Sequence, residues 1–159
     1  MNLRRKPSAP GPARSYPHLV GTGPASAGAR GGPERLYAGQ RASQAVIWEG
    51  TIYLSGQTGE PGLPLKAQAQ GALERVETLL DEAGSDKSKI LMATIRLADM
   101  GDCAAFSEVW DAWIGGRDAP ARSISEARLA APGSKVEIVV VAARPRPSDL
   151  SSPCPTCDR

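Results

Sequence analysis

Three polar residues beside strand-like apolar stretches are the best candidates for chemistry. Ser55 lies in the string SGQTG, Arg122 in PARS and Glu137 in VEIVVV. The planar guanidinium of an arginine at the end of a strand can bind a carboxylate through two parallel hydrogen bonds. In a strand of period two, Glu137 shares its face with Val139 and Val141. A carboxylate at the edge of an apolar face needs a charged partner or a chemical task.

Arg122 and Glu137 could belong to one site. The turn dipeptide Pro132-Gly133 separates their strands, and we expect it to bring the two strands side by side. Two interpretations stay open at this point. The pair either binds a substrate, or it forms a structural ion pair or points to solvent, which is the commoner arrangement for two such residues considered alone.

Several other chemistries are disfavoured. The only histidine, His18, lies in an N-terminal stretch rich in Pro, Gly and Arg, so Ser-His-Asp and Cys-His arrangements and a His-based zinc site are not expected in the domain. Cys154 and Cys157 offer two thiolates where structural zinc usually takes four ligands, so we expect no metal. Since Cys103 stands alone, we expect no disulfide framework and a cytoplasmic location.

The charge distribution bears on partners. Residues 42–143 hold nine Lys or Arg and 14 Asp or Glu, a net charge of −5, whereas residues 1–41 hold seven basic residues and one acidic residue. An acidic body is a poor match for a phosphate backbone, so nucleic acid is not an expected partner. No apolar run approaches the roughly 18 to 20 residues of a membrane-spanning helix, so no membrane is expected either.

The chain divides into three parts. Residues 1–36 form a basic, Pro- and Gly-rich extension that we expect to be disordered, with a targeting segment or an upstream translation start as alternatives. Residues 37–143 form one domain. Residues 144–159 form a second tail, also expected to be disordered.

The elements that must position the site follow from periodicity. Two β-type runs, 45–48 and 51–54, flank Glu49-Gly50 as a hairpin. Residues 65–83 carry the stripe of an amphipathic helix ending at Gly84. A third strand is expected over 90–98, with Leu91 on the same face as Ala93, and Asp99 or Asp102 caps a second helix that ends at Gly115-Gly116.

Two further strands, 123–129 and 136–142, complete the order ββαβαββ. Because hairpins begin and end this order, we expect an α+β fold with a mixed sheet and both helices on one face. Trp110 and Trp113 of the second helix are expected in the core rather than in a ligand platform.

As a set, these residues resemble a known family. The strings YLSGQTG, ADMGDCAAFSEVWDAW, APARSISEARL and KVEIVVVAA, in this order, resemble the RidA/YjgF family of reactive-intermediate deaminases, in a divergent bacterial-type branch. The resemblance implies a chorismate-mutase-like subunit, a homotrimer with clefts between subunits, and no cofactor. It implies hydrolysis of small enamines and 2-imino acids to 2-oxo acids and ammonia.

Carried over to this sequence, the resemblance assigns Arg122 to the substrate carboxylate and Glu137 to the attacking water. Ser55 and Gly56 would line the same pocket. Where the family often has cysteine, this chain has Ile124, so only its backbone could contribute.

A second departure lies ahead of the first strand, at a position where the family usually has an aromatic residue that lines the cleft. Ala42 aligns with it, and Tyr37 could substitute from nearby. A differently shaped cleft, and therefore a different imine, is compatible with both departures.

Other function classes remain. A non-catalytic trimer that binds a small carboxylate through Arg122 is the main alternative. RNA cleavage or chaperone-like holding is a third class, and the acidic body argues against RNA.

Overall fold

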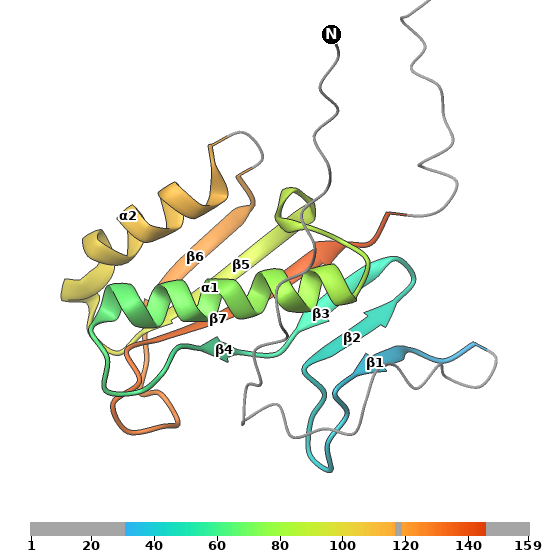
Figure 1. Ribbon diagram of the computed structural model, residues 1–159, viewed down its shortest axis with the longest axis horizontal. Coiled ribbons are helices and arrows are strands. Elements are labelled where there is room, and N and C mark those ends of the chain that lie inside the picture. The colour runs from blue at the N-terminus through green and yellow to red at the C-terminus, as the bar shows by residue number, and fades with distance from the viewer. Residues whose placement is uncertain (1–30, 117–118, 146–159) are drawn as a thin grey trace, which may run out of the picture.

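The structure, a computed structural model, describes residues 31–116 and 119–145. His18, Cys154, Cys157 and most of both expected tails lie outside the described residues. Within the described part, a seven-stranded mixed sheet and two α-helices form an α+β fold (Figure 1). The predicted fold class is therefore confirmed.

The elements follow in chain order. They are β1 (Glu34–Leu36), β2 (Ala45–Trp48), β3 (Thr51–Leu54), β4 (Gln57–Thr58), α1 (Leu65–Glu82), the 3-10 turn η1 (Lys87–Lys89), β5 (Ile90–Leu97), the 3-10 turn η2 (Met100–Asp102), α2 (Cys103–Ile114), β6 (Ala121–Glu126) and β7 (Val136–Ala143). The predicted order ββαβαββ is present, with two short strands added. Of these, β1 begins ahead of the expected domain start at Tyr37, and β4 lies in a segment for which no element was predicted.

The local signals set the first half of the fold. Strands β2 and β3 pair antiparallel around Glu49 and Gly50, both of which have positive φ angles, 48° and 79°. Two positive φ angles make a hairpin turn whose twist matches that of the strands. Helix α1 ends before Gly84, whose φ of +76° gives the expected left-handed C-terminal residue.

The predicted C-terminal hairpin is wrong. The strand order is β1-β2-β3-β7-β5-β6, so β5 lies between β6 and β7. Strand β6 pairs parallel with β5, because α2 crosses over between them and a β-α-β connection makes parallel neighbours. Strand β6 also runs over Ala121–Glu126 rather than 123–129. Pro132-Gly133 belongs to a longer loop, in which Gly62 N–H donates to the Gly133 carbonyl at 3.1 Å.

The start of β5 departs from strict alternation. A register shift between Ile90 and Met92 against β7 marks a bulge at Leu91. As a result Ile90 is buried and Leu91 is 53% exposed, the reverse of the expected faces. A bulge inserts one residue and exchanges the faces on its two sides.

The core lies between the sheet and the two helices, which cover the same face (Figure 1). Alternate strand residues such as Ile52, Ile95, Ile138 and Val140 are fully buried beneath them. Trp110 is 3% exposed, as expected of a core residue. The opposite side of the sheet is called the outer face, and its apolar side chains are those of Val46, Trp48, Tyr53, Met92, Val139 and Val141.

Candidate functional site

Glu137 lies on the outer face near the start of β7. Its Oε2 accepts a hydrogen bond from Arg96 Nη1 at 2.5 Å, and the side chains of Glu137 and Arg96 are 25% and 43% exposed. The two residues are direct partners in the antiparallel pairing of β5 with β7. Glu137 therefore has a charged partner, Arg96, to which no role was assigned from the sequence.

Gly56 fits against the second oxygen of the same carboxylate. A Cβ atom at position 56 would lie 2.6 Å from Glu137 Oε1 and 2.7 Å from its Cδ. Strand β4 follows immediately and pairs with β7, with Thr58 opposite Glu137. Only glycine fits here, because the Glu137 side chain occupies the space that a Cβ atom would take, so Gly56 and Glu137 lie in direct contact.

Ser55 belongs to a polar cluster behind Gly56. Its hydroxyl donates to Gln44 Oε1 at 3.0 Å and accepts from Gln57 Nε2 at 3.1 Å. Gln57 is 3% exposed and also donates to the Ser55 carbonyl at 3.0 Å. Buried polar groups that are fully paired make a turn rigid. Ser55 therefore fixes the path of the chain that places Gly56.

A buried glutamine positions the start of β7 from the helix side. Gln68 of α1 has no exposed surface, and its Nε2 donates to the carbonyls of Leu63 and Gly133 at 2.8 and 2.9 Å. Its Oε1 accepts from Lys135 N–H at 2.8 Å. The loop that enters β7 is thus held to α1 two residues before Glu137. Gln68 was not predicted from the sequence. The one feature that could have indicated its role is that its amide lies within the apolar stripe of the helix.

Arg122 lies on the helix-covered face of the sheet. It is paired in register with Ala93, which is fully buried, and its guanidinium carbon lies 5.6 Å from the centre of the Trp110 ring. Glu137 lies on the outer face. The prediction that their strands lie alongside is wrong, and in one chain the two side chains are on opposite faces with β5 between their strands.

Strand β6 is an edge of the sheet, and Ile124 presents its backbone there. Ala127 N–H donates to the Leu97 carbonyl of β5 at 2.9 Å. Successive strand residues direct their backbone groups to opposite sides, so Ser123 and Ser125 share the direction of Ala127. The N–H and C=O groups of Arg122 and Ile124 therefore face away from β5, on the open side of an edge strand.

Ala42, at the position of the family aromatic, and Tyr37, its possible substitute, both lie ahead of β2. Ala42 is exposed, and its carbonyl accepts from Gly39 N–H at 2.8 Å. The Tyr37 hydroxyl donates to Glu82 Oε1 of α1 at 2.8 Å. That hydrogen bond, together with burial and the negative charge of Glu82, raises the pKa of Tyr37. The Tyr37 hydroxyl is thus engaged with α1.

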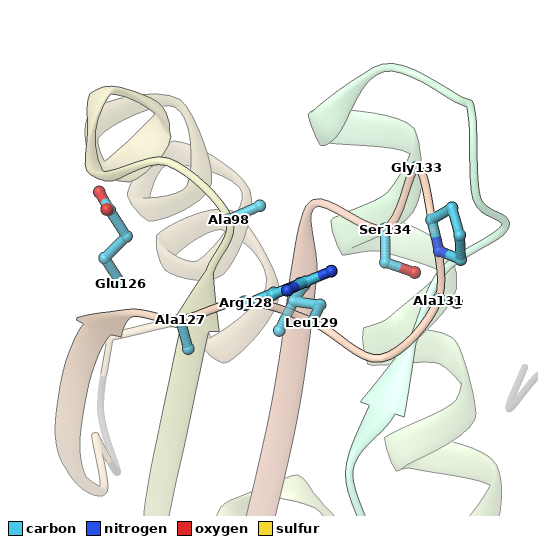
Figure 2. A pocket seen from close by; sticks show the side chains of 9 residues that line it. Ala98, Glu126, Ala127, Arg128, Leu129, Ala131, Gly133 and Ser134 are labelled. Atoms are coloured by element: carbon cyan, nitrogen blue, oxygen red, sulfur yellow. The ribbon is translucent and has the colours of Figure 1, made fainter.

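A pocket of about 570 Å³ opens where the loop from β6 to β7 turns, with Glu126, Arg128 and Pro132 among its lining residues (Figure 2). The Ser134 hydroxyl has no hydrogen-bond partner among the described residues, but this atom is enclosed and cannot touch a molecule in the pocket. Neither Arg122 nor Glu137 lines this pocket.

Among residues 31–116 and 119–145, no group of three or more His, Cys, Asp and Glu side chains could hold a metal ion. In the same ranges, neither helix has the length and apolar character needed to cross a membrane.

Comparisons with known proteins agree with the fold. The family described as Endoribonuclease L-PSP matches residues 33–144. The RutC family protein YoaB of Escherichia coli is 40% identical over 109 residues, covering 69% of this chain and 96% of that protein. A crystal structure of a YjgF family member from Neisseria meningitidis has 40% sequence identity and a TM-score of 0.70, and covers 73% of this chain and 98% of that one.

A relative with a named activity is more distant. The 2-iminobutanoate/2-iminopropanoate deaminase of mouse is 34% identical over 108 residues, covering 63% of this chain and 78% of the mouse protein. Two helices on one face of a mixed sheet make this chain a small α+β protein. The chain belongs to the RidA/YjgF family within that class.

Proposed function

We propose that this protein hydrolyses small 2-imino acids and their enamine tautomers to 2-oxo acids and ammonia. The observation that carries the proposal is the placement of Glu137. Its carboxylate lies on a largely apolar sheet face, with Oε2 on Arg96 and Oε1 against Gly56. The name of the mouse relative, 2-iminobutanoate/2-iminopropanoate deaminase, supports the choice of substrate.

The proposed site is shared between copies of the chain in a homotrimer. Arg122 and Glu137 of one chain lie on opposite faces of the sheet, so one small substrate could not contact both. Two features favour a second copy: the edge of β6 beside Arg122, and an outer face on which Trp48 is 41% and Tyr53 is 48% exposed. Arg122 of one copy would then complete the site around Glu137 of another.

The chemistry needs few groups. Arg122 binds the substrate carboxylate, and the Ile124 backbone at the same edge can add hydrogen bonds. Glu137 holds a water molecule against C2 of the protonated imine and takes a proton from it as the new C–O bond forms. The nitrogen of the resulting carbinolamine accepts that proton from Glu137. The C–N bond then breaks as the hydroxyl proton passes to the Glu137 carboxylate, and ammonia leaves a 2-oxo acid.

One observation favours a second candidate, a non-catalytic protein that binds small carboxylates. Arg96 already neutralises the charge of Glu137, which is also the arrangement of a structural ion pair. Such a protein would bind 2-oxo acids through Arg122 without turnover.

The test is release of ammonia and 2-oxo acid from 2-iminopropanoate and 2-iminobutanoate, both generated in situ by an amino-acid oxidase. The protein is compared with Arg122→Ala and with Arg35→Ala, which changes an exposed arginine of β1. We expect faster hydrolysis that Arg122→Ala abolishes and Arg35→Ala leaves intact. Binding of 2-oxobutanoate with no acceleration would replace the enzyme by the carboxylate-binding protein.

A further inference from the structure

We infer that Arg96 is a positioning residue that sets the orientation of the Glu137 carboxylate for water attack, an inference that rests on the proposed function. Arg96 does not touch the substrate in this arrangement. It acts through Glu137, by holding Oε2 so that Oε1 stays free for the water molecule.

Arg96 lies in a row of polar side chains on the outer face of the sheet. Four neighbouring strands place polar side chains at one level of the outer face: Ser125 on β6, Arg96 on β5, Glu137 on β7 and Thr58 on β4. The next outer-face residue of β7 is Val139. This polar row crosses a face that is otherwise largely apolar. Placing a charged pair there costs desolvation free energy, so we expect the pair to have a function.

The two carboxylate oxygens of Glu137 have different neighbours. Arg96 Nη1 contacts Oε2 at 2.5 Å, and the space that a side chain at position 56 would fill lies 2.6 Å from Oε1. A glutamate has three rotatable side-chain bonds and samples several rotamers unless it is held. With Oε2 tied to a guanidinium and the rest of the carboxylate packed against Gly56, the side chain is held in one orientation, in which Oε1 can accept a hydrogen bond from the attacking water.

The Arg96–Glu137 pair is less exposed than the ion pair between the two helices. Lys66 and Glu108, at 59% and 68% side-chain exposure, bridge α1 and α2 where solvent screens them. Glu137 is 25% exposed in a single chain, and a copy packed on the outer face would bury it further. Solvent therefore weakens the attraction between Arg96 and Glu137 less than it weakens the attraction within a surface pair.

The experiment measures kcat and KM for 2-iminobutanoate with Arg96→Ala, Arg96→Lys and a matched control, Arg144→Ala. The Arg144–Glu34 pair spans 2.6 Å with side-chain exposures of 37% and 31%, close to those of the Arg96–Glu137 pair, and it lies on β1 and the end of β7. We expect Arg96→Ala to lower kcat about 100-fold with KM changed by less than about twofold, since misplacement of a reacting group acts on kcat. Arg96→Lys should recover most of the loss, and Arg144→Ala should match the unchanged protein.

Chemical rescue separates positioning from folding. Millimolar ethylguanidinium should restore much of the kcat of Arg96→Ala, because the added guanidinium can occupy the vacated place beside Oε2. It should restore nothing in Glu137→Gln. Sedimentation velocity on each variant checks that the assembly of the unchanged protein is kept.

The outcomes are distinct. If the unchanged protein hydrolyses the imine and Arg96→Ala keeps a kcat within about threefold of it, the positioning role is overturned and the proposed function stands. A loss of kcat that neither lysine nor ethylguanidinium repairs also overturns the role, because Arg96 would then serve the structure alone. If the unchanged protein does not exceed the uncatalysed rate, the proposed function fails and this inference fails with it.

Discussion

Glu137 depends on its nearest neighbours for any chemistry it performs. A carboxylate on an apolar surface has few partners, and here Arg96 and Gly56 account for one oxygen each. Residue type and period-two spacing singled out Ser55 and Glu137 in the sequence, and the family resemblance added Gly56. Arg96 was not selected, because its importance follows from the pairing of β5 with β7, which no local pattern specifies.

Gly56→Ala should reduce imine hydrolysis far more than it reduces stability. The new methyl group would lie 2.6 Å from Glu137 Oε1, so the carboxylate must rotate away, and about 10- to 100-fold of kcat should be lost. The clash is with the end of a flexible side chain, so the cost in unfolding free energy should stay below about 1.5 kcal/mol. Initial rates and urea unfolding measure the two effects.

Gly71→Ala is the matched control. A Cβ atom there would meet only Gly59 Cα at 3.8 Å, an ordinary contact, within helix α1. Alanine in a helix interior stabilises by up to about 1 kcal/mol relative to glycine, so this variant should be active and slightly more stable. Equal activity in both variants would remove Gly56 from the site.

Tyr37 gives a pH dependence of stability. Its hydrogen bond to Glu82, then burial and the charge of Glu82, raise its pKa above 10.0. A raised pKa in the folded state means that the contribution is complete below the unfolded value and is lost as pH rises through the folded value. Because the hydroxyl is near the surface, the contribution is less than about 1 kcal/mol.

Tyr37→Phe tests this directly. From about pH 9 to pH 11.5, the Tm of the unchanged protein should fall more steeply than that of Tyr37→Phe, and the two curves should converge at the alkaline end. Thermal unfolding followed by circular dichroism gives both curves. Parallel curves across this range would mean that the hydrogen bond to Glu82 contributes nothing to stability.

At the scale of elements, α1 and the loop into β7 form one unit through Gln68. Its amide makes three hydrogen bonds to backbone groups of Leu63, Gly133 and Lys135. Arg75, about two helix turns further along, donates to the Thr58 carbonyl of β4. These contacts connect α1 to both segments that flank Glu137.

Gln68→Leu should destabilise the domain by about 3 kcal/mol, because it leaves buried backbone groups without partners. Gln70→Leu is the control, since Gln70 is exposed on the same helix and its replacement should change stability by less than about 0.5 kcal/mol. Urea midpoints of both variants, at equal m-values, give the comparison. A Gln68→Leu protein as stable as Gln70→Leu would show that the loop is held by other contacts.

The elements that were predicted correctly are specified by residues next to them in the sequence. Those that were missed depend on residues elsewhere in the chain or are very short. The β2–β3 hairpin and both helices were predicted because each is set by adjacent residues, such as Glu49-Gly50 at the turn or Gly84 at the end of α1. The partner of β6 depends on the rest of the sheet. Reading Pro132-Gly133 as a hairpin turn was wrong, and the strand–helix–strand order of β5, α2 and β6 was the signal for parallel pairing. Strands β1 and β4 are too short for alternation to show.

At the scale of the whole molecule, the geometry of one chain leaves the proposed site incomplete. Arg122 is stacked over Trp110 on the helix side, and Glu137 lies across the sheet on the outer face. An apolar outer face that includes Met92, at 44% exposure, is a surface that a second copy can cover. If the proposed function holds, activity belongs to the assembly and not to the single chain.

Subunit mixing tests this. Arg122→Ala and Glu137→Gln should each be inactive alone, but chains of the two variants, unfolded together and refolded as a mixture, should regain activity. In a random equal mixture, a given interface joins an intact Arg122 to an intact Glu137 in about one case in four, so about a quarter of the unchanged activity is expected from a cyclic assembly. Refolding each variant separately and mixing afterwards is the control, and should stay inactive if subunits exchange slowly. No recovery in co-refolded chains of the normal assembly size would place both residues in a single-chain site, and the proposed arrangement would then be wrong.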